Sequence, residues 1–173
     1  MDINERASKI ECLLCDVDGT LTDGRIMIRG KERLRVFDIK DGLGIYVWKR
    51  AGFKFGFITG DNSADTKMRA DMLGADYKYF NCIDKRGAIK EILQKGDLKP
   101  QQIAFVGDDL IDIPVMRKVG MAVSTGDAVP ELERASHYKT SAAGGRGAVR
   151  EVIELILKAK GAWDAIVEEF YQD

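Results

Sequence analysis

Two aspartates lie two residues apart at the end of the first apolar run of the chain. Residues 10–15 (IECLLC) have the length and composition of a buried strand, and Asp16, Asp18 and a glycine follow directly. A strand that stops at Asp-x-Asp-Gly delivers two carboxylates to the carboxyl edge of a sheet, where open α/β sheets bind their ligands. This arrangement suits phosphoryl transfer, because one carboxylate can attack phosphorus and help to hold a metal while the other handles the leaving-group proton.

The same residues have two other readings. Asp-Gly is a common turn pair, so the motif alone is equally compatible with a structural turn. A calcium-binding loop also begins Asp-x-Asp, but it requires a glycine at its sixth position and a bidentate glutamate at its twelfth. Counted from Asp16, these positions hold Leu21 and Met27. The sequence therefore excludes the calcium loop.

Further polar side chains follow later apolar runs or open a helix. Thr59 and the pair Asp108-Asp109 each end an apolar run, and Lys85 opens a predicted helix. Oxygen ligands with few protein carboxylates suit Mg²⁺, which keeps waters and takes its last ligand from phosphate. Each of these residues has a structural explanation on its own, such as a helix N-cap or a solvated lysine. Together, and in this order, they indicate a site for phosphoryl transfer.

The elements that would position these residues alternate between strands and helices. Such alternation predicts an α/β fold with a Rossmann-like, doubly wound parallel sheet and helices on both faces. Residues 25–38, whose alternating apolar residues flank Gly30-Lys31, predict a protruding β-hairpin. The expected strands are 10–15, 53–58, 77–80, 103–106 and 121–123. The expected helices are 42–51, 65–73, 84–94, 110–119 and 147–160, before an aromatic tail at 161–173.

Composition restricts the class of protein. A chain of 173 residues with 45% apolar and 32% charged residues suits one soluble domain over 1–173. The net charge is −1, with lysines and arginines spread along the chain, so neither a nucleic-acid footprint nor a membrane patch is expected. No apolar run approaches the about 18–20 residues of a spanning helix. The polar N-terminus lacks the apolar core of a signal peptide, and we expect a cytoplasmic protein.

The cysteines and the single histidine indicate no further chemistry. Cys12, Cys15 and Cys82 form an odd set without the paired ligands of a zinc site or a disulfide framework. Cys12 and Cys15 should face opposite ways on one strand, which disfavours a redox pair. His137 is expected to be structural.

These motifs resemble those of the haloacid dehalogenase superfamily of phosphohydrolases over essentially the whole chain. DVDGT, ITG, the Lys85 region and GDDLID match its four motifs in order. The resemblance implies that Asp16 is the nucleophile, forming an aspartyl phosphate, and that Asp18 protonates the leaving group and then activates water. It also implies that Asp16, the backbone carbonyl of Asp18 and Asp108 bind Mg²⁺, that Thr59 and Lys85 hold the phosphoryl group, and that Asp109 or Asp112 orients Lys85 or the metal waters.

The spacing of the motifs resembles a capless subgroup. The stretches from Asp16 to Thr59 and from Thr59 to Lys85 leave no room for a cap domain, so a neighbouring subunit or a large substrate must cover the site. DVDGTLTDG, FDIKDGLGI, VGDDLIDIPVM and AGGRGAVREV resemble the tetrameric subgroup that hydrolyses 3-deoxy-D-manno-octulosonate 8-phosphate, an eight-carbon sugar-acid phosphate. The resemblance implies this small-molecule substrate and a homotetramer. The hairpin is the natural oligomerisation element.

The resemblance also implies a sugar-binding set. The stretch AGGRGAVREV would reach an adjacent subunit's site, where Arg146 or Arg150 would pair with the sugar carboxylate. The other residues expected to bind substrate are Asp18, Asp38, Ile39, Lys40, Asp41, Gly42, Thr59, Gly60, Arg69 and Lys85.

Two positions depart from the subgroup. It often has an arginine directly after ITG, where this chain has Asp61, and it can have a basic residue where Tyr46 stands. Both changes should weaken binding of an acidic sugar, unless another arginine substitutes. A nine-carbon sialic-acid-type 9-phosphate and a broad sugar phosphatase or phosphotransferase activity therefore remain alternatives. So does the phosphatase-like domain attached to some acylneuraminate cytidylyltransferases. A non-catalytic oligomeric scaffold is disfavoured, because every motif aspartate and Lys85 are present.

Overall fold

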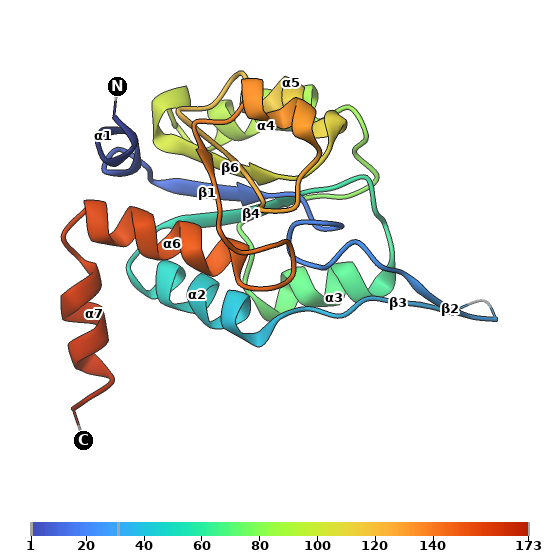
Figure 1. Ribbon diagram of the computed structural model, residues 1–173, viewed down its shortest axis with the longest axis horizontal. Coiled ribbons are helices and arrows are strands. Elements are labelled where there is room, and N and C mark those ends of the chain that lie inside the picture. Colours follow the sequence, from blue (N-terminus) through green and yellow to red (C-terminus); the bar gives the residue numbers. More distant parts are fainter. Residues whose placement is uncertain (1, 31, 173) are drawn as a thin grey trace.

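The computed structural model describes residues 2–30 and 32–172, and its centre is a six-stranded parallel sheet (Figure 1). The strand order is β5-β4-β1-β6-β7-β8. The order reverses at β1, which is the kind of switch point where α/β sheets bind ligands. The strands are β1 (Cys12–Cys15), β4 (Lys54–Ile58), β5 (Tyr77–Tyr79), β6 (Ile103–Gly107), β7 (Met121–Ser124) and β8 (Tyr138–Lys139).

Helices cover both faces of the sheet, as Figure 1 shows, and the predicted fold class is confirmed. The central strand explains why both faces must be covered. Leu13 and Cys15 lie in one buried cluster, and Cys12 and Leu14 lie in the other. This alternation is the period of two of a strand, and burial on both sides is typical of parallel sheets. On the first face lie α1 (Ile3–Ala7), α2 (Ile39–Arg50), α3 (Ala64–Met72), α6 (Ala148–Ala159) and α7 (Trp163–Glu169), and on the second α4 (Arg86–Lys95) and α5 (Ile113–Met116).

Two helices differ from their expected positions. The helix expected at 42–51 begins at Ile39, because the Asp38 carboxylate accepts the Lys40 N–H at 2.6 Å and caps the helix three residues earlier. The helix expected at 110–119 is a short 3₁₀ turn, Leu110–Asp112, followed by the four-residue α5. Two further 3₁₀ turns span Pro100–Gln102 and Pro130–Arg134.

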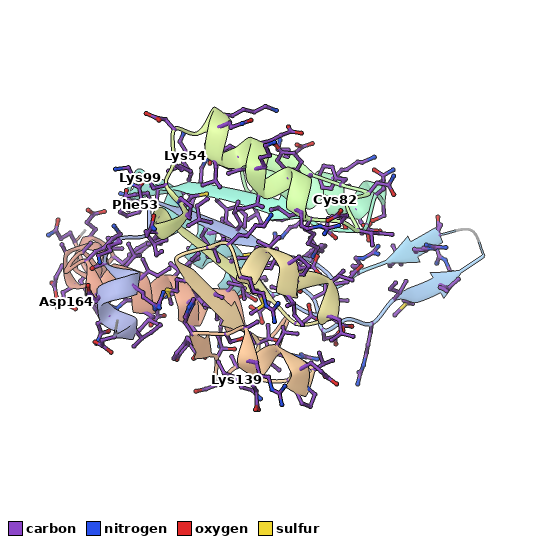
Figure 2. The ribbon with its side chains drawn as sticks, turned by 90° about the horizontal axis from the view of Figure 1, so that it is seen from above. Phe53, Lys54, Cys82, Lys99, Lys139 and Asp164 are labelled. Carbon is purple, nitrogen blue, oxygen red and sulfur yellow. The ribbon has the colours of Figure 1, made fainter. Side chains whose placement is uncertain are left out.

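A hairpin projects from the body of the protein. It pairs β2 (Met27–Arg29) with β3 (Glu32–Leu34) in antiparallel register, and every residue of both strands is exposed. Figure 2 shows it leaving the side on which Cys82 lies, opposite Lys54 at the start of β4, so it projects from the carboxyl edge of the sheet. The turn expected at Gly30-Lys31 includes residue 31, which lies outside the described residues. No helix in 2–30 or 32–172 is long and apolar enough to cross a bilayer.

A buried carboxylate joins two helices on one face. Asp41, in the first turn of α2, is 1% exposed and accepts the N–H groups of Arg150 at 2.8 Å and Gly147 at 3.3 Å. The residue preceding α6 is Gly147, which has no capping side chain, so α2 supplies the cap. Burial raises the pKa of Asp41 to about 6, although the N–H groups of α6 act in the opposite direction. Asp41 was expected to bind substrate, but its carboxylate is directed at α6.

We expect Asp41→Ala to lower the free energy of unfolding by about 2 kcal/mol, because buried N–H groups at the start of α6 lose their acceptor. Urea unfolding followed by circular dichroism measures the loss. The matched control is Asp71→Ala, which removes an exposed ion pair with Lys78. That control should change stability by less than about 0.5 kcal/mol. Equal losses in the two variants would contradict the capping role.

Candidate active site

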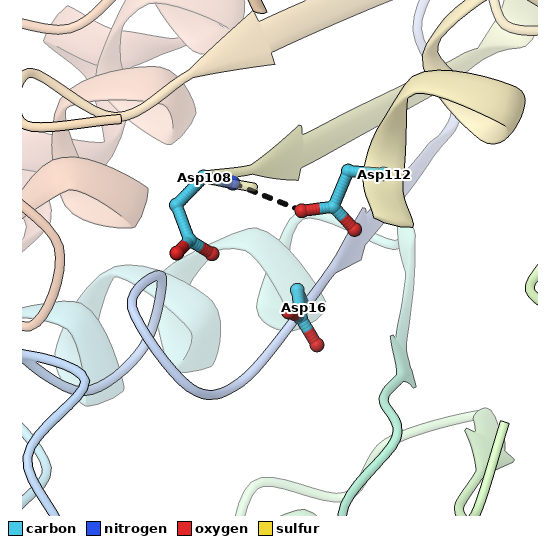
Figure 3. Close-up of side chains that lie close together, drawn as sticks. All are labelled: Asp16, Asp108 and Asp112. Carbon is cyan, nitrogen blue, oxygen red and sulfur yellow. Dashed lines mark hydrogen bonds between the residues drawn. The ribbon is translucent and has the colours of Figure 1, made fainter. Parts of the chain in front are cut away.

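Three carboxylates converge at the carboxyl edge of the sheet (Figure 3). Asp16 directly follows β1, and Asp108 and Asp112 lie just beyond β6, its neighbour in the sheet. One oxygen from each carboxylate lies within 4.8 Å of the others. The second oxygen of Asp112 accepts the Asp108 N–H at 2.9 Å, the contact drawn in Figure 3. Two adjacent parallel strands therefore bring the first and fourth motifs together.

A fully buried lysine completes this acidic centre. The Lys85 ammonium lies 2.9 Å from Oδ1 of Asp16 and 2.6 Å from Oδ1 of Asp112. Burial acts against the charged amine, but these two carboxylates prevail and raise the pKa of Lys85. Of the two aspartates expected to orient Lys85, Asp112 contacts it. Asp109 is exposed, and its carboxylate accepts the Leu110 N–H at 2.6 Å.

The centre has the character of a divalent cation site. Burial and the neighbouring carboxylates of Asp16 and Asp112 raise the pKa of Asp108 to about 8. Burial likewise raises the pKa of Asp16, with Lys85 acting against it. Carboxylates held this close favour a proton or a cation between them. An all-oxygen donor set fits Mg²⁺, with Asp16, Asp108 and the carbonyl of Asp18 as the expected ligands.

The loop after β1 carries Asp16 and Asp18, the expected catalytic pair, and is therefore called the catalytic loop. It is shaped to pass beside Asp108. Gly19 has φ +85°, and a Cβ built on it would lie 2.0 Å from Oδ2 of Asp108. The neighbouring Thr20 donates its hydroxyl to Oδ1 of the same aspartate at 3.0 Å. Any side chain at Gly19 would therefore occupy the place of an expected metal ligand.

The glycine-rich stretch near residue 145 closes over this loop. The Gly145 N–H donates to the Thr20 carbonyl at 2.9 Å, and a Cβ on Gly144 would lie 1.8 Å from the Gly19 carbonyl oxygen. In the structure the stretch covers the catalytic loop of its own chain, and its expected reach to an adjacent subunit's site stays a prediction.

Thr59 reaches the same edge from the other side of β1. It follows β4, which pairs with β1 in parallel, and its side chain is buried. Its hydroxyl oxygen accepts the Asp61 N–H at 3.1 Å, and the half-buried Gly60 stands between them. This position suits the expected role in holding a phosphate oxygen.

Asp18 is held by an arginine that no sequence motif indicated. Nε and Nη2 of Arg35 lie 2.6 and 3.0 Å from the two oxygens of Asp18. Nη2 also lies 2.8 Å from Asp61, and Nη1 donates to Ser63 at 3.0 Å. The Arg35 side chain is 2% exposed. The one signal in the sequence that could have indicated such an arginine was Asp61. An aspartate at a site for an anionic substrate needs a cation beside it.

A groove beside the catalytic loop collects part of the expected sugar-binding set. Arg146 is exposed there, with its guanidinium 3.4 Å from Asp23. Arg69 lies behind the groove, 5.4 Å from the Phe37 ring, and donates to the Asp38 carbonyl at 3.2 Å. The Arg69 guanidinium also packs against Gly42. The groove is lined by Asp23, Val36, Phe37, Asp38, Ile39, Lys40, Gly145 and Arg146.

Other singled-out residues have structural contacts. Arg150 pairs with Glu154 at 2.7 Å and stacks 5.2 Å from the Trp163 ring, so it does not line the groove. Tyr46 is exposed on α2, 5.9 Å from the Arg50 guanidinium. Nδ1 of His137 accepts the Ala122 N–H at 2.9 Å, which is a structural role.

The parallel sheet, the motif carboxylates at its edge and the buried lysine define a haloacid dehalogenase-like hydrolase. Residues 79–153 match the model of that family. The chain is 42% identical to the 3-deoxy-D-manno-octulosonate 8-phosphate phosphatase of Yersinia pestis over 160 residues, covering 92% of this chain and 86% of that protein. The identity to the phosphatase of the same name from Escherichia coli K12 is also 42%, over 164 residues, covering 94% and 87%.

A solved structure agrees with these relatives. The 3-deoxy-D-manno-octulosonate 8-phosphate phosphatase of Moraxella catarrhalis, in complex with a magnesium ion, a phosphate ion and a KDO molecule, superposes with a TM-score of 0.94. It is 36% identical, and the match covers 97% of both chains. This chain therefore belongs to the haloacid dehalogenase-like hydrolases, in the family of the 3-deoxy-D-manno-octulosonate 8-phosphate phosphatases. The resemblance predicted from its motifs is confirmed.

We expect Mg²⁺ to raise the melting temperature more at pH 8 than at pH 6. Burial and the neighbouring carboxylates raise the pKa of Asp108 from 3.8 to about 8, so below that pH a binding Mg²⁺ has to displace a proton from it. Lowering the pH then weakens apparent Mg²⁺ binding, by up to about tenfold per pH unit for one proton. Thermal melts with and without Mg²⁺ at pH 6, 7 and 8 measure this.

Asp108→Asn serves as the control, because it removes both the competing proton and a ligand oxygen. Its melting temperature should respond little to Mg²⁺ at any of the three pH values. A pH-independent response in the unaltered protein, or a full response in Asp108→Asn, would contradict this assignment.

Proposed function

We propose that the protein is a Mg²⁺-dependent phosphatase that hydrolyses 3-deoxy-D-manno-octulosonate 8-phosphate (KDO 8-phosphate) to the free sugar acid and phosphate. The buried contact of Lys85 with Asp16 and Asp112 carries the proposal, because it sets a nucleophile and a phosphate-neutralising cation at one edge of the sheet. The relatives at 42% identity supply the substrate class.

The residues divide the chemistry between them. Asp16 attacks phosphorus and becomes an aspartyl phosphate as the bond to the sugar oxygen breaks, and Asp18 gives that oxygen a proton. Asp18 then takes a proton from the water that attacks the aspartyl phosphate, which restores Asp16. Lys85 and Thr59 hold the phosphoryl oxygens. Mg²⁺, when bound, neutralises their negative charge.

The groove beside the loop is the proposed place of the sugar. Arg146 offers the exposed guanidinium for its carboxylate, and Lys40 adds a second cation at the rim. A nine-carbon sugar-acid phosphate is the second candidate, because Asp61 stands where the eight-carbon subgroup often has arginine.

We expect phosphate release with Mg²⁺ to be fastest on KDO 8-phosphate when that substrate is compared with a nine-carbon sialic-acid 9-phosphate and with neutral sugar phosphates. The groove offers the cations of Lys40 and Arg146 to a sugar carboxylate. The relatives at 42% identity are named as phosphatases of this substrate. Equal rates on acidic and neutral sugars would contradict the substrate and leave the phosphatase chemistry standing.

Asp16→Asn provides the control for the site. It should lower phosphate release by about three orders of magnitude or more, because it removes the nucleophile. Asp84→Asn, a change of the same type at an exposed residue paired with Arg86, should leave the rate unchanged. Near-normal activity of Asp16→Asn would contradict the mechanism.

We further propose that the protein acts in the cytoplasm as one domain and that it assembles as a homotetramer around the hairpin. Met27 and Ile28 on β2 are 63% and 69% exposed, and Val36 beyond β3 is 73% exposed. Exposed apolar side chains gathered on one element are typical of an interface.

We expect Met27→Asp with Ile28→Asp to shift the sedimenting species towards monomer and to lower activity at micromolar concentration. Both changes place charge on the apolar hairpin. Sedimentation velocity at the assay concentration measures this. A fully active monomer of the unaltered protein would contradict the role of the hairpin.

A further inference from the structure

We propose that Arg35, at the root of the hairpin, is a positioning residue for Asp18, and that Asp61 fixes Arg35 in place. Arg35 would hold the Asp18 carboxylate in one orientation for proton transfer in both half-reactions. The inference rests on the proposed function, because it assigns Arg35 its effect through the acid–base role of Asp18.

The contact between Arg35 and Asp18 is a planar, two-point pair. Nε meets one carboxylate oxygen at 2.6 Å and Nη2 meets the other at 3.0 Å. This two-point contact, called the fork below, fixes both the position and the plane of a carboxylate. A lysine ammonium does not do so. The Asp18 side chain is 33% exposed, so without the fork it would be free to rotate into solvent.

The fork leaves Asp18 able to react. Each carboxylate oxygen has two lone pairs, and the two contacts with Arg35 use one on each oxygen. A remaining position can carry the proton that passes to the sugar oxygen, and the same position, once free, can take a proton from the attacking water. The guanidinium does not release its own proton, so it orients the acid without replacing it.

The far side of the guanidinium is held by the segment after the second motif. Nη2 lies 2.8 Å from Asp61, Nη1 donates to Ser63 at 3.0 Å, and Asp65 lies 3.5 Å from Nη1. Ser63 in turn donates its hydroxyl to Asp61. The arginine is 2% exposed and is anchored from two loops at once.

This network explains why an aspartate can follow ITG in this chain. Asp61 would repel an anionic substrate if its charge were unpaired, which is the weakening expected from its sequence position. Its carboxylate is instead 10% exposed and paired with Arg35. The cation comes from the hairpin, while the residue after ITG supplies the anion that holds it.

The leaving group provides the sharpest test. A sugar alkoxide needs a proton from Asp18, whereas p-nitrophenolate leaves without one. We expect Arg35→Gln to lower kcat/KM for the sugar phosphate by about a hundredfold and kcat/KM for p-nitrophenyl phosphate by less than about threefold. Because Asp18 also activates water, the variant should release nitrophenolate in a burst close to one per active site before a slow steady state.

Two further variants separate position from charge. Arg35→Lys keeps a positive charge but not the fork, so it should show the same selective loss for the sugar phosphate, to a smaller extent. Asp61→Asn should cause a smaller selective loss than Arg35→Gln. The double variant should lose no more activity than Arg35→Gln alone. Arg134→Gln removes an exposed arginine from the 3₁₀ turn Pro130–Arg134, outside the site and the hairpin, and should match the unaltered protein on both substrates.

The outcomes distinguish this inference from the proposed function. Equal losses on both substrates in Arg35→Gln and Arg35→Lys, or no loss on either, would overturn the positioning role. Additive effects of Asp61→Asn and Arg35→Gln would overturn the role of Asp61. An unaltered protein that hydrolyses neither substrate would count against the proposed function. A selective loss with a burst supports the inference, and circular dichroism confirms that each variant is folded.

Discussion

The site depends on one buried ammonium between two buried carboxylates. Lys85 contacts Asp16 and Asp112 within 2.9 Å, and Asp112 also accepts the Asp108 N–H. This single cation therefore links the strand that ends at Asp16, the proposed nucleophile, with the helix that follows the third motif and with the loop that carries an expected metal ligand. Removing one partner of such a group typically costs about 3–5 kcal/mol, because an uncompensated charge is left inside the protein.

A second chain of contacts supports the same centre from outside the sheet. Asp41 caps α6 from α2, and the glycine-rich stretch before α6 lies on the carbonyl of Gly19. Gly19 in turn leaves space for the Asp108 carboxylate. The helices that cover one face of the sheet thus also set the position of the catalytic loop. The residues that pack these helices together therefore also fix the geometry of the candidate active site.

The sheet and the position of the candidate residues at its edge were predictable because both follow from local patterns. Short apolar runs buried on both sides are typical of parallel strands, and polar residues at their carboxyl ends converge at one edge, as Asp16, Thr59 and Asp108 do. The motif spacing also predicted the absence of a cap. Within the described residues, only the hairpin and α2 lie between β1 and β4, and only α3 and β5 lie between β4 and α4.

The remaining features depend on partners far apart in the chain, which no local pattern encodes. Asp41 resembled a substrate ligand by position, but its acceptor role depends on a helix end 106 residues further on. Asp109 and Asp112 were equivalent in sequence, and only the 3₁₀ turn between them directs one to Lys85 and leaves the other exposed. Arg35 became recognisable only when the hairpin root was placed beside Asp18 and Asp61.

The position of the glycine-rich stretch also has a consequence for the biosynthesis of the protein. The proposed nucleophile lies at residue 16, while the segment that closes over its loop lies near residue 145. Strand β1 gains its two neighbours only after β4 and β6 have been made. On a ribosome the catalytic loop emerges early and without its cover. The apolar strand before it stays unpaired until β4 and β6 are made, and an exposed apolar strand favours chaperone binding. Translation must pass the start of α6 before the nascent chain can assemble a working active site.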